Sequence, residues 1–295
     1  MELVSVVIPV YNEEEAIAGD LDLVQRTMDA SGLAYELIVV NDGSTDRTVE
    51  IVSGYPRVKL LHHERNRGNG AARTTGMKAA RGDVVIMTDG DGTYPNQDMP
   101  KLLQYLTETD ANGGLRYPMV IGARTKEKGT LRWLRTPAKW FIRKLACYLT
   151  ETQIPDLNSG LRAFRKDLAM RYLNILPNTH SWVSTITIAF LSDGYGVKFV
   201  PIDYYTRKGH SKFHPLRDTY NYLTLVVRAV TYFNPIKIFL PFSLALSGVG
   251  VVKALYDIVA YRWHFAPSTL LLLLTAIQVG AVGLLADLVV RRARQ

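Results

Sequence analysis

The sequence predicts an α/β protein, in which a doubly wound, mostly parallel sheet is followed by a hairpin of two membrane-spanning helices. Two observations support this prediction. Over residues 1–125, short β-branched runs alternate with helix-forming segments, the pattern of a parallel sheet covered by helices. Most of the longest uncharged runs follow Pro235, and 295 residues suffice for one large domain with a smaller appendage.

Four strands are predicted in the N-terminal part, at residues 4–10, 35–40, 58–61 and 84–88. The first is a β-branched run without polar alternation, as expected of a strand buried on both faces. Helices are predicted between them, at about residues 16–30, up to residue 52, and at residues 70–80. We expect Asn12, followed by three glutamates, to cap the first helix, and Ser44 or Thr45 to cap the second.

Two transmembrane helices are predicted near the C-terminus. Residues 266–286 carry no charge, and their 21 residues span about 30 Å of hydrocarbon at a rise of about 1.5 Å per residue. The run Ile238–Val252 is shorter, but Lys237 and Lys253 at its ends can extend toward headgroups. The alternative, a buried hairpin in a soluble core, would need a polar stripe, which Leu270–Leu274 lacks.

These spans give a domain organisation and an orientation. We predict a cytoplasmic domain at 1–212, a juxtamembrane helix at 213–234, and within 235–295 two transmembrane helices at about 236–256 and 266–289. The apolar run at residues 3–9 is too short for a signal peptide and lacks a basic flank. Arg291, Arg292 and Arg294 follow the last span, so both termini are expected in the cytoplasm of a multi-pass cell-membrane protein. The single cysteine, Cys147, fits a reducing compartment.

Positive charge is concentrated in one stretch of the chain. The net charge is +8, and residues 122–150 contain eight basic residues against one acid, Glu127. Apolar residues, Trp133 and Trp140 among them, alternate with these charges, which favours an amphipathic helix near 130–150 lying in the headgroup region of an anionic membrane. A solvated basic face is the alternative. Nucleic-acid binding ranks lower, because two membrane spans already supply a partner for a basic helix. We therefore expect this stretch to bind a lipid bilayer and not a nucleic acid.

Polar residues follow the predicted strands where a parallel sheet binds its ligands. Tyr11, Glu13, Asp42, Asp89 and Asp91 should therefore meet at one edge. Two carboxylates one residue apart after a buried strand can hold Mg²⁺ or Mn²⁺ against a diphosphate. Asp-x-Asp is a short motif, however, and a turn with two solvated acids is the alternative where no other motif accompanies it.

Other motifs do accompany it. In order, these are Val-Ile-Pro-Val-Tyr-Asn-Glu at 7–13, Val-Asn-Asp-Gly-Ser-Thr-Asp at 40–46, Asn-Arg-Gly at 66–68 and Asp-Gly-Asp at 89–91. With them the chain resembles the family 2 glycosyltransferases, which have the Rossmann-like GT-A fold. The segments 156–164 and 207–212 look like those of dolichyl-phosphate mannose synthase and the bacterial polyprenyl-phosphate glycosyltransferases. The resemblance covers residues 3–212.

The resemblance implies a role for each matching residue. Nucleotide-sugar binding is expected at Pro9, Tyr11, Glu13, Val40, Asp42, Asp89, Gly90, Asp91, Arg124, Arg207 and Lys212. The metal is expected at Asp89 and Asp91, and the catalytic group at Asp89, Asp91, Arg124 and Arg207. Candidates for holding a lipid phosphate are Arg132, Arg135, Ser159 and Arg162, arginine being favoured for its bidentate geometry. The chain departs from the group at Gly92-Thr93-Tyr94-Pro95, where leucine and glutamine are usual, so a side chain near the metal is expected to differ.

An absent carboxylate narrows the chemistry. Between His180 and Leu191 there is no acid, whereas many sugar-to-sugar enzymes of the family carry an acidic pair there as general base. A phosphate acceptor is already anionic and needs no base. We therefore expect inverting transfer of a hexose from GDP-mannose or UDP-glucose to a polyprenyl or dolichyl phosphate on the cytoplasmic membrane face.

Other functions stay open. The enzyme alternative is a sugar-to-sugar transferase or polysaccharide synthase of the same fold, and the non-enzyme alternative is a catalytically silent membrane scaffold. A nucleotidyltransferase would need a glycine-rich, lysine-containing opening loop in place of Pro9–Asn12. No oligomeric state follows from the sequence, although four glycines would allow close helix packing in a homo-oligomer: Gly248, Gly250, Gly280 and Gly283.

Three smaller features have two interpretations each. The turn Asn66–Gly70 is either an anion site at a helix N-terminus or a tight strand-to-helix turn. Asp156 either orients one of the phosphate-binding arginines or caps a turn. The adjacent His62 and His63 lie outside the predicted edge and, like the other histidines, are assigned to no metal.

Overall fold

The computed structural model describes residues 3–125, 144, 146–148, 150–179, 181–206, 235–260 and 264–293. The strands are β1 (Val4–Val10), β2 (Tyr35–Asn41), β3 (Val58–His62), β4 (Val84–Met87), β5 (Met119–Arg124), β6 (Arg162–Arg165) and β7 (Val197–Ile202). The helices are α1 (Ile17–Ser31), α2 (Thr48–Ser53), α3 (Asn69–Ala79), η1 (Asn96–Asp98), α4 (Met99–Tyr105), α6 (Lys166–Met170), η2 (Leu173–Ile175), α7 (Trp182–Ser192), α9 (Ile236–Ala260) and α10 (Pro267–Ala293).

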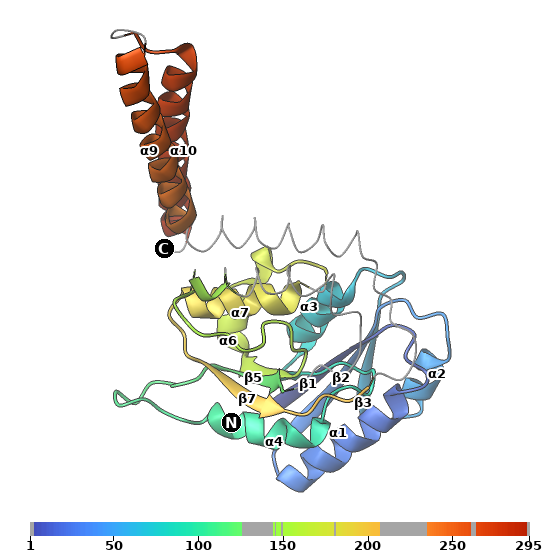
Figure 1. Ribbon diagram of the computed structural model, residues 1–295. Coiled ribbons are helices and arrows are strands. Elements are labelled where there is room, and N and C mark those ends of the chain that lie inside the picture. Colours follow the sequence, from blue (N-terminus) through green and yellow to red (C-terminus); the bar gives the residue numbers. More distant parts are fainter. Residues whose placement is uncertain are drawn as a thin grey trace. The chain divides into compact units, whose positions relative to one another are not determined.

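One seven-stranded sheet organises the N-terminal part, with strand order β3-β2-β1-β4-β6-β5-β7 (Figure 1). The β1 strand is central and pairs in parallel with β2 and β4. Only β6 runs against its neighbours β4 and β5, while β7 is parallel to β5. The predicted α/β class with a mostly parallel sheet is therefore confirmed, and the four predicted strands occur within about a residue of their expected ends.

Helices cover both faces of this sheet. Figure 1 shows α1 and α4 on one face and α3 and α7 on the other. The α1 helix buries Ile17, Leu21, Val24 and Met28, which recur at helical spacing along one side. Full burial of each such side chain contributes about 1.5–3 kcal/mol before the entropy of ordering is counted. Because every residue of β1 is buried, the ends of the central strands are left as the place for polar chemistry.

The predicted helix caps are wrong. The residue before α1 is Ala16 and the residue before α2 is Arg47, and neither makes a capping side-chain hydrogen bond. Asn12 instead bridges two loops: its backbone N–H donates to Ser44 Oγ at 3.0 Å, and its Oδ1 accepts the Thr45 N–H at 2.7 Å. The reason is topological. The loops after β1 and β2 leave neighbouring parallel strands at the same edge, so each finds its nearest partners in the other.

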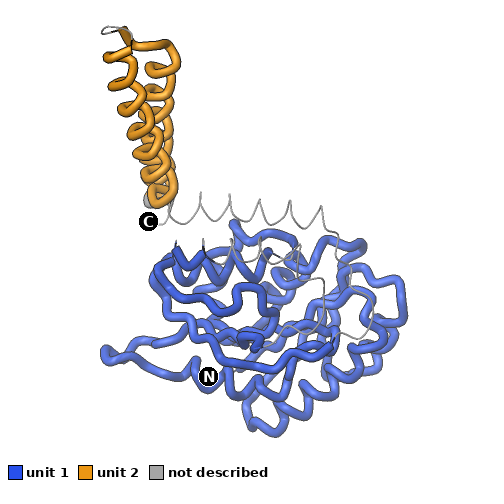
Figure 2. The backbone as a smooth tube through the Cα atoms, viewed as in Figure 1, with its two compact units in different colours: residues 1–225 blue, residues 226–295 orange. Residues whose placement is uncertain are grey.

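The chain divides into two compact units, residues 1–225 and 226–295, shown in separate colours in Figure 2. The second unit contains α9 and α10, of 25 and 27 residues. Both helices are long and apolar enough to cross a membrane, and most of their apolar side chains are exposed in the chain by itself. The expected pair of C-terminal apolar helices is therefore confirmed.

Small residues let the two helices of the hairpin pack closely. Three of the four glycines considered for oligomer contacts face the other helix: Gly250 lies against Leu273, Gly280 against Ser243 and Gly283 against Phe239. Among the described residues, Gly248 alone of the four has open space around it. Close packing within one hairpin thus accounts for three of these glycines.

A buried carboxylate joins α9 to the start of α10. Asp257 is fully buried, accepts the backbone N–H of Ala266 at 2.9 Å, and also accepts the hydroxyl of Thr269. Lys253, one turn earlier on α9, places Nζ 3.3 Å from the same carboxylate. Asp257 therefore supplies an acceptor to the N-terminal turn of α10.

Candidate active site

The sheet brings the first two motifs together at the carboxyl ends of β1 and β2. In the parallel register Pro9 lies opposite Val40, and the Asp42 N–H donates to the Val10 carbonyl at 2.9 Å. In the loop after β1, the backbone N–H of Glu13 donates to Thr48 Oγ1 at 2.8 Å, while Tyr11 is half-buried. Their predicted roles in nucleotide binding stay predictions, but they share one edge as expected.

The Asp-Gly-Asp loop follows β4 at the same edge. The Asp89 side chain is 26% exposed, and Asp91 Oδ1 accepts both the N–H and the hydroxyl of Thr93, at 3.2 and 2.5 Å. Among the described residues no cluster of three or more His, Cys, Asp or Glu forms a closed metal cage. Two carboxylates at an open edge fit a hard cation such as Mg²⁺ or Mn²⁺, whose remaining ligands would come from water and a diphosphate.

A buried acid on α1 holds this loop from the α1 side of the sheet. Asp20, 4% exposed, accepts the Gly92 N–H at 2.8 Å through Oδ2 and the Asn96 amide at 3.0 Å through Oδ1. Asn96 in turn accepts the Thr88 hydroxyl at 2.7 Å. Gly92 has a positive φ of 73°, which suits glycine. The network connects the residues on both sides of the two aspartates, so the loop is held at both ends.

An arginine on α3 holds it from the α3 side. Arg73 is 2% exposed, forms an ion pair with Asp89 Oδ1, and donates from Nε to Asn69 Oδ1 at 2.6 Å. Arg73 is not among the residues predicted for the site. The sequence pattern that could have indicated it is the position of an arginine among small residues such as Gly70 and Gly76, on the face of α3 that is buried. An arginine on a buried helix face needs an anionic or hydrogen-bonding partner.

The second predicted site carboxylate, Asp42, is 2% exposed and fully engaged. Oδ1 lies 2.7 Å from His63 Nδ1 and accepts the Arg67 N–H at 2.9 Å, while Oδ2 accepts the Gly68 N–H at 2.8 Å. His63 Nε2 lies 2.9 Å from Thr75 Oγ1. The placement of His63 outside the edge is therefore wrong. A carboxylate can only accept, so Nδ1 carries a proton.

The turn Asn66–Gly70 is occupied by protein partners. Gly68 has a φ of 99°, and a Cβ there would run into the carbonyl of Asn178. The Gly70 N–H donates to that same carbonyl at 3.0 Å, and the N–H of Gly68 points to Asp42. Of the two interpretations of this turn, the geometry favours a tight strand-to-helix connection over an anion site.

Arg124, at the end of β5, is bound in a bidentate ion pair. Its Nε and Nη2 donate to the two oxygens of Asp156 at 2.7 and 2.9 Å, and its guanidinium lies 5.1 Å from the ring centre of Tyr204. Burial raises the pKa of Asp156, but the hydrogen bonds from Arg124 outweigh it and leave the pKa below its ordinary value. Asp156 thus orients Arg124, and it also accepts the Asn158 N–H at 3.0 Å in a turn.

Tyr94, where the chain departs from the family motif, connects the Asp-Gly-Asp loop to the segment that follows Asp156. Tyr94 is 4% exposed, and its hydroxyl accepts the Gly160 N–H at 2.6 Å. Burial, and after it the charge of Asp89, raises the pKa of Tyr94, so the phenol stays neutral. Gly160 has no room for a side chain, because a Cβ would press on Asp89 Oδ2 and Arg73 Nη2. The segment after Asp156 therefore lies directly against the Asp-Gly-Asp loop.

The two described candidates for the lipid phosphate are buried. Arg162 donates to the Val183 carbonyl at 2.7 Å, to Thr187 Oγ1 at 3.0 Å and to the carbonyl of Ser159. Burial, and next Arg73, lowers the pKa of Arg162 to about 9. Among the described residues the buried hydroxyl of Ser159 has no hydrogen-bond partner. A phosphate contact at either residue stays a prediction. In Arg162, Nη1 and Nη2 are bound to protein acceptors, while among the described residues the buried Nε has no hydrogen-bond partner.

Several predicted features lie outside the described residues. These are Arg132, Arg135, Arg207, Lys212, most of the helix expected near 130–150 and the juxtamembrane helix at 213–234.

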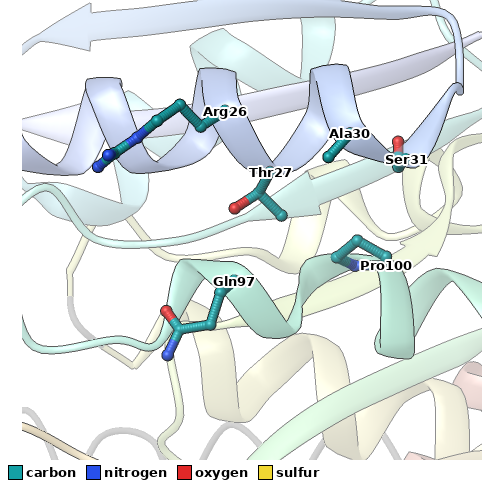
Figure 3. Close-up of a pocket in the computed structure, with 6 residues that line it drawn as sticks. All are labelled: Arg26, Thr27, Ala30, Ser31, Gln97 and Pro100. Carbon is teal, nitrogen blue, oxygen red and sulfur yellow. The ribbon is translucent and has the colours of Figure 1, made fainter.

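A groove of about 430 Å³ lies between α1 and the segment of η1 and α4 (Figure 3). Arg26 and Gln97 are its longest polar side chains, and Thr27, Ala30, Ser31 and Pro100 complete the lining. Neither a predicted site residue nor a carboxylate is among these described lining residues, so the candidate chemistry lies at the strand ends.

Two family models match the chain. Residues 5–173 match the model described as glycosyl transferase family 2, and residues 234–291 match the GtrB C-terminal hairpin. The first match contains all four motifs of the N-terminal domain, and the second covers both apolar helices.

Curated relatives extend over most of the chain. An uncharacterised glycosyltransferase YkcC of Bacillus subtilis is 31% identical, covering 90% of this chain and 79% of that protein. A dolichyl-phosphate hexose transferase of Haloferax volcanii is 32% identical over 72% of this chain and 86% of its own length. An undecaprenyl-phosphate 4-deoxy-4-formamido-L-arabinose transferase of Edwardsiella ictaluri is 27% identical over 99% and 90%.

A solved structure shares the fold. Glucosyl-3-phosphoglycerate synthase from Mycobacterium tuberculosis, in complex with Mn²⁺, UDP and its product, has a TM-score of 0.60 and 22% sequence identity, covering 77% of this chain and 80% of that one. At this identity the likeness establishes the GT-A fold. The family match over residues 5–173 and the 31% identity to YkcC show that the chain belongs to glycosyltransferase family 2.

Proposed function

We propose that this chain is an inverting glycosyltransferase that moves a hexose from a nucleotide-sugar, GDP-mannose or UDP-glucose, to a polyprenyl or dolichyl phosphate. The product is a polyprenyl-phosphate monosaccharide. Support comes from the family 2 domain joined to a two-helix apolar hairpin, and from relatives named as dolichyl-phosphate and undecaprenyl-phosphate sugar transferases.

The observation that favours a phosphate acceptor is the composition of α7. From Trp182 to Ser192 this helix carries serine and threonine but no acid, and the next acid, Asp193, accepts the Tyr172 hydroxyl at 2.6 Å. A sugar hydroxyl needs a general base to remove its proton, whereas a phosphate oxygen is anionic near neutral pH. In the described part of the chain, α7 supplies no such base.

The proposed reaction balances without a proton transfer. A phosphate oxygen of the lipid attacks C1 of the sugar from the face opposite the nucleotide, and the bond from C1 to the diphosphate oxygen breaks with its electron pair. The nucleoside diphosphate departs and the configuration at C1 inverts. The task left to the protein is to position two anions and neutralise their charge.

The described residues divide this task. Asp89 and Asp91 would hold Mg²⁺ or Mn²⁺, which when bound neutralises charge on the departing diphosphate. Thr93 fixes Asp91 through two hydrogen bonds, and Asp156 fixes the direction of Arg124. Pro9, Tyr11, Glu13, Val40 and Gly90 belong to the same edge and are proposed to line the nucleotide. The catalytic domain and both termini are proposed to lie on the cytoplasmic side.

The test is sugar transfer into lipid by the purified chain. Radiolabelled UDP-glucose and, separately, GDP-mannose are offered with undecaprenyl or dolichyl phosphate and Mn²⁺ or Mg²⁺. We expect label in the solvent-extractable phase that EDTA abolishes and that falls by roughly 1,000-fold in Asp91→Asn, since a metal of this kind supplies several kcal/mol. Asp110→Asn, at an exposed acid whose Oδ1 accepts the N–H groups of Asn112 and Gly114 in its own turn, is the matched control.

Two results would contradict the proposal. If nucleotide binds but no common nucleotide-sugar labels the lipid, the phosphate acceptor is wrong. If label appears on a glycan acceptor instead, the sugar-to-sugar alternative is correct.

A further inference from the structure

We propose that Arg73 is a positioning residue of this site, which acts on the reaction only through Asp89. By this proposal, which rests on the proposed function, Arg73 fixes the direction of the Asp89 carboxylate toward the donor. Nothing in the family motifs quoted above includes Arg73, and the assignment comes from its contacts.

The geometry leaves Arg73 no direct access to a substrate. Its side chain is 2% exposed, whereas that of its ion-pair partner Asp89 is 26% exposed. Nε is bound to Asn69 at 2.6 Å, and Nη1 lies 3.8 Å from the sulfur of Met87 in the strand below. Of this pair, only the carboxylate reaches the open edge of the sheet, so the proposed effect of Arg73 on the donor passes through Asp89.

Steric contacts restrict Asp89 to one arrangement. Oδ1 is bound to Arg73, and on the other side Gly160 leaves no room for even a Cβ against Oδ2. Tyr94, which accepts the Gly160 N–H at 2.6 Å, keeps that backbone in place. The carboxylate is therefore clamped between a cation and a backbone segment. A freely rotating Asp89 would lose orientational entropy each time a donor bound, and the clamp removes that cost in advance.

An arginine suits this position better than a lysine. Its planar guanidinium donates in fixed directions, here to Asn69 from Nε and to Asp89 from Nη2. A lysine has the charge but one flexible nitrogen, so it can balance Asp89 without fixing its direction. Arg73→Lys therefore keeps the positive charge beside Asp89 but removes the fixed direction of the hydrogen bond, so it tests the two contributions separately.

Arg73 also affects cation binding, in the opposite direction. A guanidinium bound to one of the two motif carboxylates repels a divalent ion nearby. Replacing Arg73 by a neutral side chain should thus leave Mn²⁺ binding intact or tighter while impairing turnover. A residue needed only for the fold would lose both together, and this difference in sign makes the proposal testable.

The experiment uses the purified chain and four variants: Arg73→Gln, Arg73→Lys, Asp89→Asn and the double variant Arg73→Gln/Asp89→Asn. Mn²⁺ binding is measured by electron paramagnetic resonance of the free ion, with and without UDP or GDP, and kcat and KM are measured in the lipid-transfer assay. Arg57→Gln removes an exposed arginine that pairs with Asp29 on the surface, and is the matched control. Far-ultraviolet circular dichroism reports folding.

For Arg73→Gln we expect kcat to fall by about 10- to 100-fold, as is usual for loss of a group that orients a ligand, with Mn²⁺ affinity unchanged or higher. Arg73→Lys should keep more activity than Arg73→Gln. In the Asp89→Asn background the substitution of Arg73 should have no further effect on kcat, because the residue it acts through is already altered. Arg57→Gln should match the unmodified protein.

Three outcomes would overturn the proposal: additive losses in the double variant, equal loss of Mn²⁺ binding and turnover in a folded Arg73→Gln, or unchanged kcat in that variant. If Arg73→Gln does not fold, the cycle is run with Arg73→Lys and the same criteria apply. The Mn²⁺ and nucleotide binding measurements need neither sugar nor lipid. They therefore still distinguish the outcomes for Arg73 if the proposed acceptor itself proves wrong.

Discussion

Two ion pairs, one in each compact unit, bury opposite members: Arg73–Asp89 buries the cation and Lys253–Asp257 buries the acid. In the sheet domain the cation Arg73 is 2% exposed and its acid Asp89 is 26% exposed. In the hairpin the acid Asp257 is 0% exposed and its cation Lys253 is 33% exposed. In each pair the buried side chain makes the contacts within the protein, and the exposed side chain is the one that can contact other molecules. For Asp89 that molecule is a ligand at the sheet edge, and for Lys253 it is a lipid headgroup.

The pair Arg124–Asp156 tests this comparison most strongly, because both of its side chains are only 12% and 11% exposed. Asp156→Ala removes the carboxylate to which Nε and Nη2 of a nearly buried guanidinium donate, so we expect a loss of about 3 kcal/mol in the free energy of unfolding. Transfer activity should fall with it, since Arg124 loses its direction. Chemical denaturation and lipid-transfer kinetics measure the two effects. Loss of stability with full activity would show that this pair is structural and remove Arg124 from the catalytic group.

The same pair has a defined pH dependence. The pKa of Asp156 is lowered in the folded chain, so its contribution is complete above the ordinary aspartate value of about 3.9 and is lost only as the pH falls through the lowered folded value. The difference in stability between the unmodified protein and Asp156→Ala should therefore be constant from about pH 5 to 8. A difference that shrinks already near neutral pH would contradict the charged pair.

Gly160→Ala is expected to have the next largest effect and tests the exposed member of the Arg73–Asp89 pair. The new Cβ would press on Asp89 Oδ2 and Arg73 Nη2, so the carboxylate must turn away. A small misplacement of this kind costs about 100-fold in rate. Gly19→Ala is the control, because nothing lies within 4 Å of its added Cβ. Equal activity of the two variants would show that the clamp on Asp89 does not matter for turnover.

The predictions that succeeded for the sheet domain are those that follow from regular parallel strands. Parallel strands align their carboxyl ends, so the residues after β1, β2 and β4 had to meet once the strands were recognised, and the four motif regions did meet at one edge. The strands themselves were identifiable because each is a short, mainly apolar run rich in Val, Ile or Leu. The hairpin was predictable for an equally simple reason, the length of its uncharged runs.

What the sequence did not predict are contacts between side chains far apart in the chain. Arg73 with Asp89, His63 with Asp42, and Asp156 with Arg124 are separated by 16, 21 and 32 residues. Local patterns carry no information on such partners. The incorrect cap predictions have the same origin. Ser44 and Thr45 bind Asn12, which lies 32 and 33 residues away in the chain, and do not cap the helix that follows them.

His63→Gln compares two adjacent histidines. His63 is 7% exposed and touches Asp42, while His62 is exposed, so His62→Gln is a matched control. Removing the imidazole loosens both Asp42 and, through it, the turn at Arg67 and Gly68. Because Asp42 is proposed to act in nucleotide binding, we expect KM for the donor to rise about 10-fold with kcat nearly unchanged. This result indicates a contact that stabilises the bound donor and the transition state equally. A fall in kcat alone would place His63 with the chemistry instead.

Asp257→Leu, in the hairpin, should have the smallest effect and should separate the two units. The substitution removes the acceptor for Ala266 and Thr269 at the start of α10, and hydrogen bonds between membrane helices are worth about 1–2 kcal/mol at most. We therefore expect a slightly lower thermal stability in detergent and unchanged transfer kinetics. Val259→Ala, at a side chain 83% exposed on the same helix, is the control. If Asp257→Leu lowered kcat while the hairpin stayed folded, the buried acid would serve more than structure, and the contrast between the two pairs would fail.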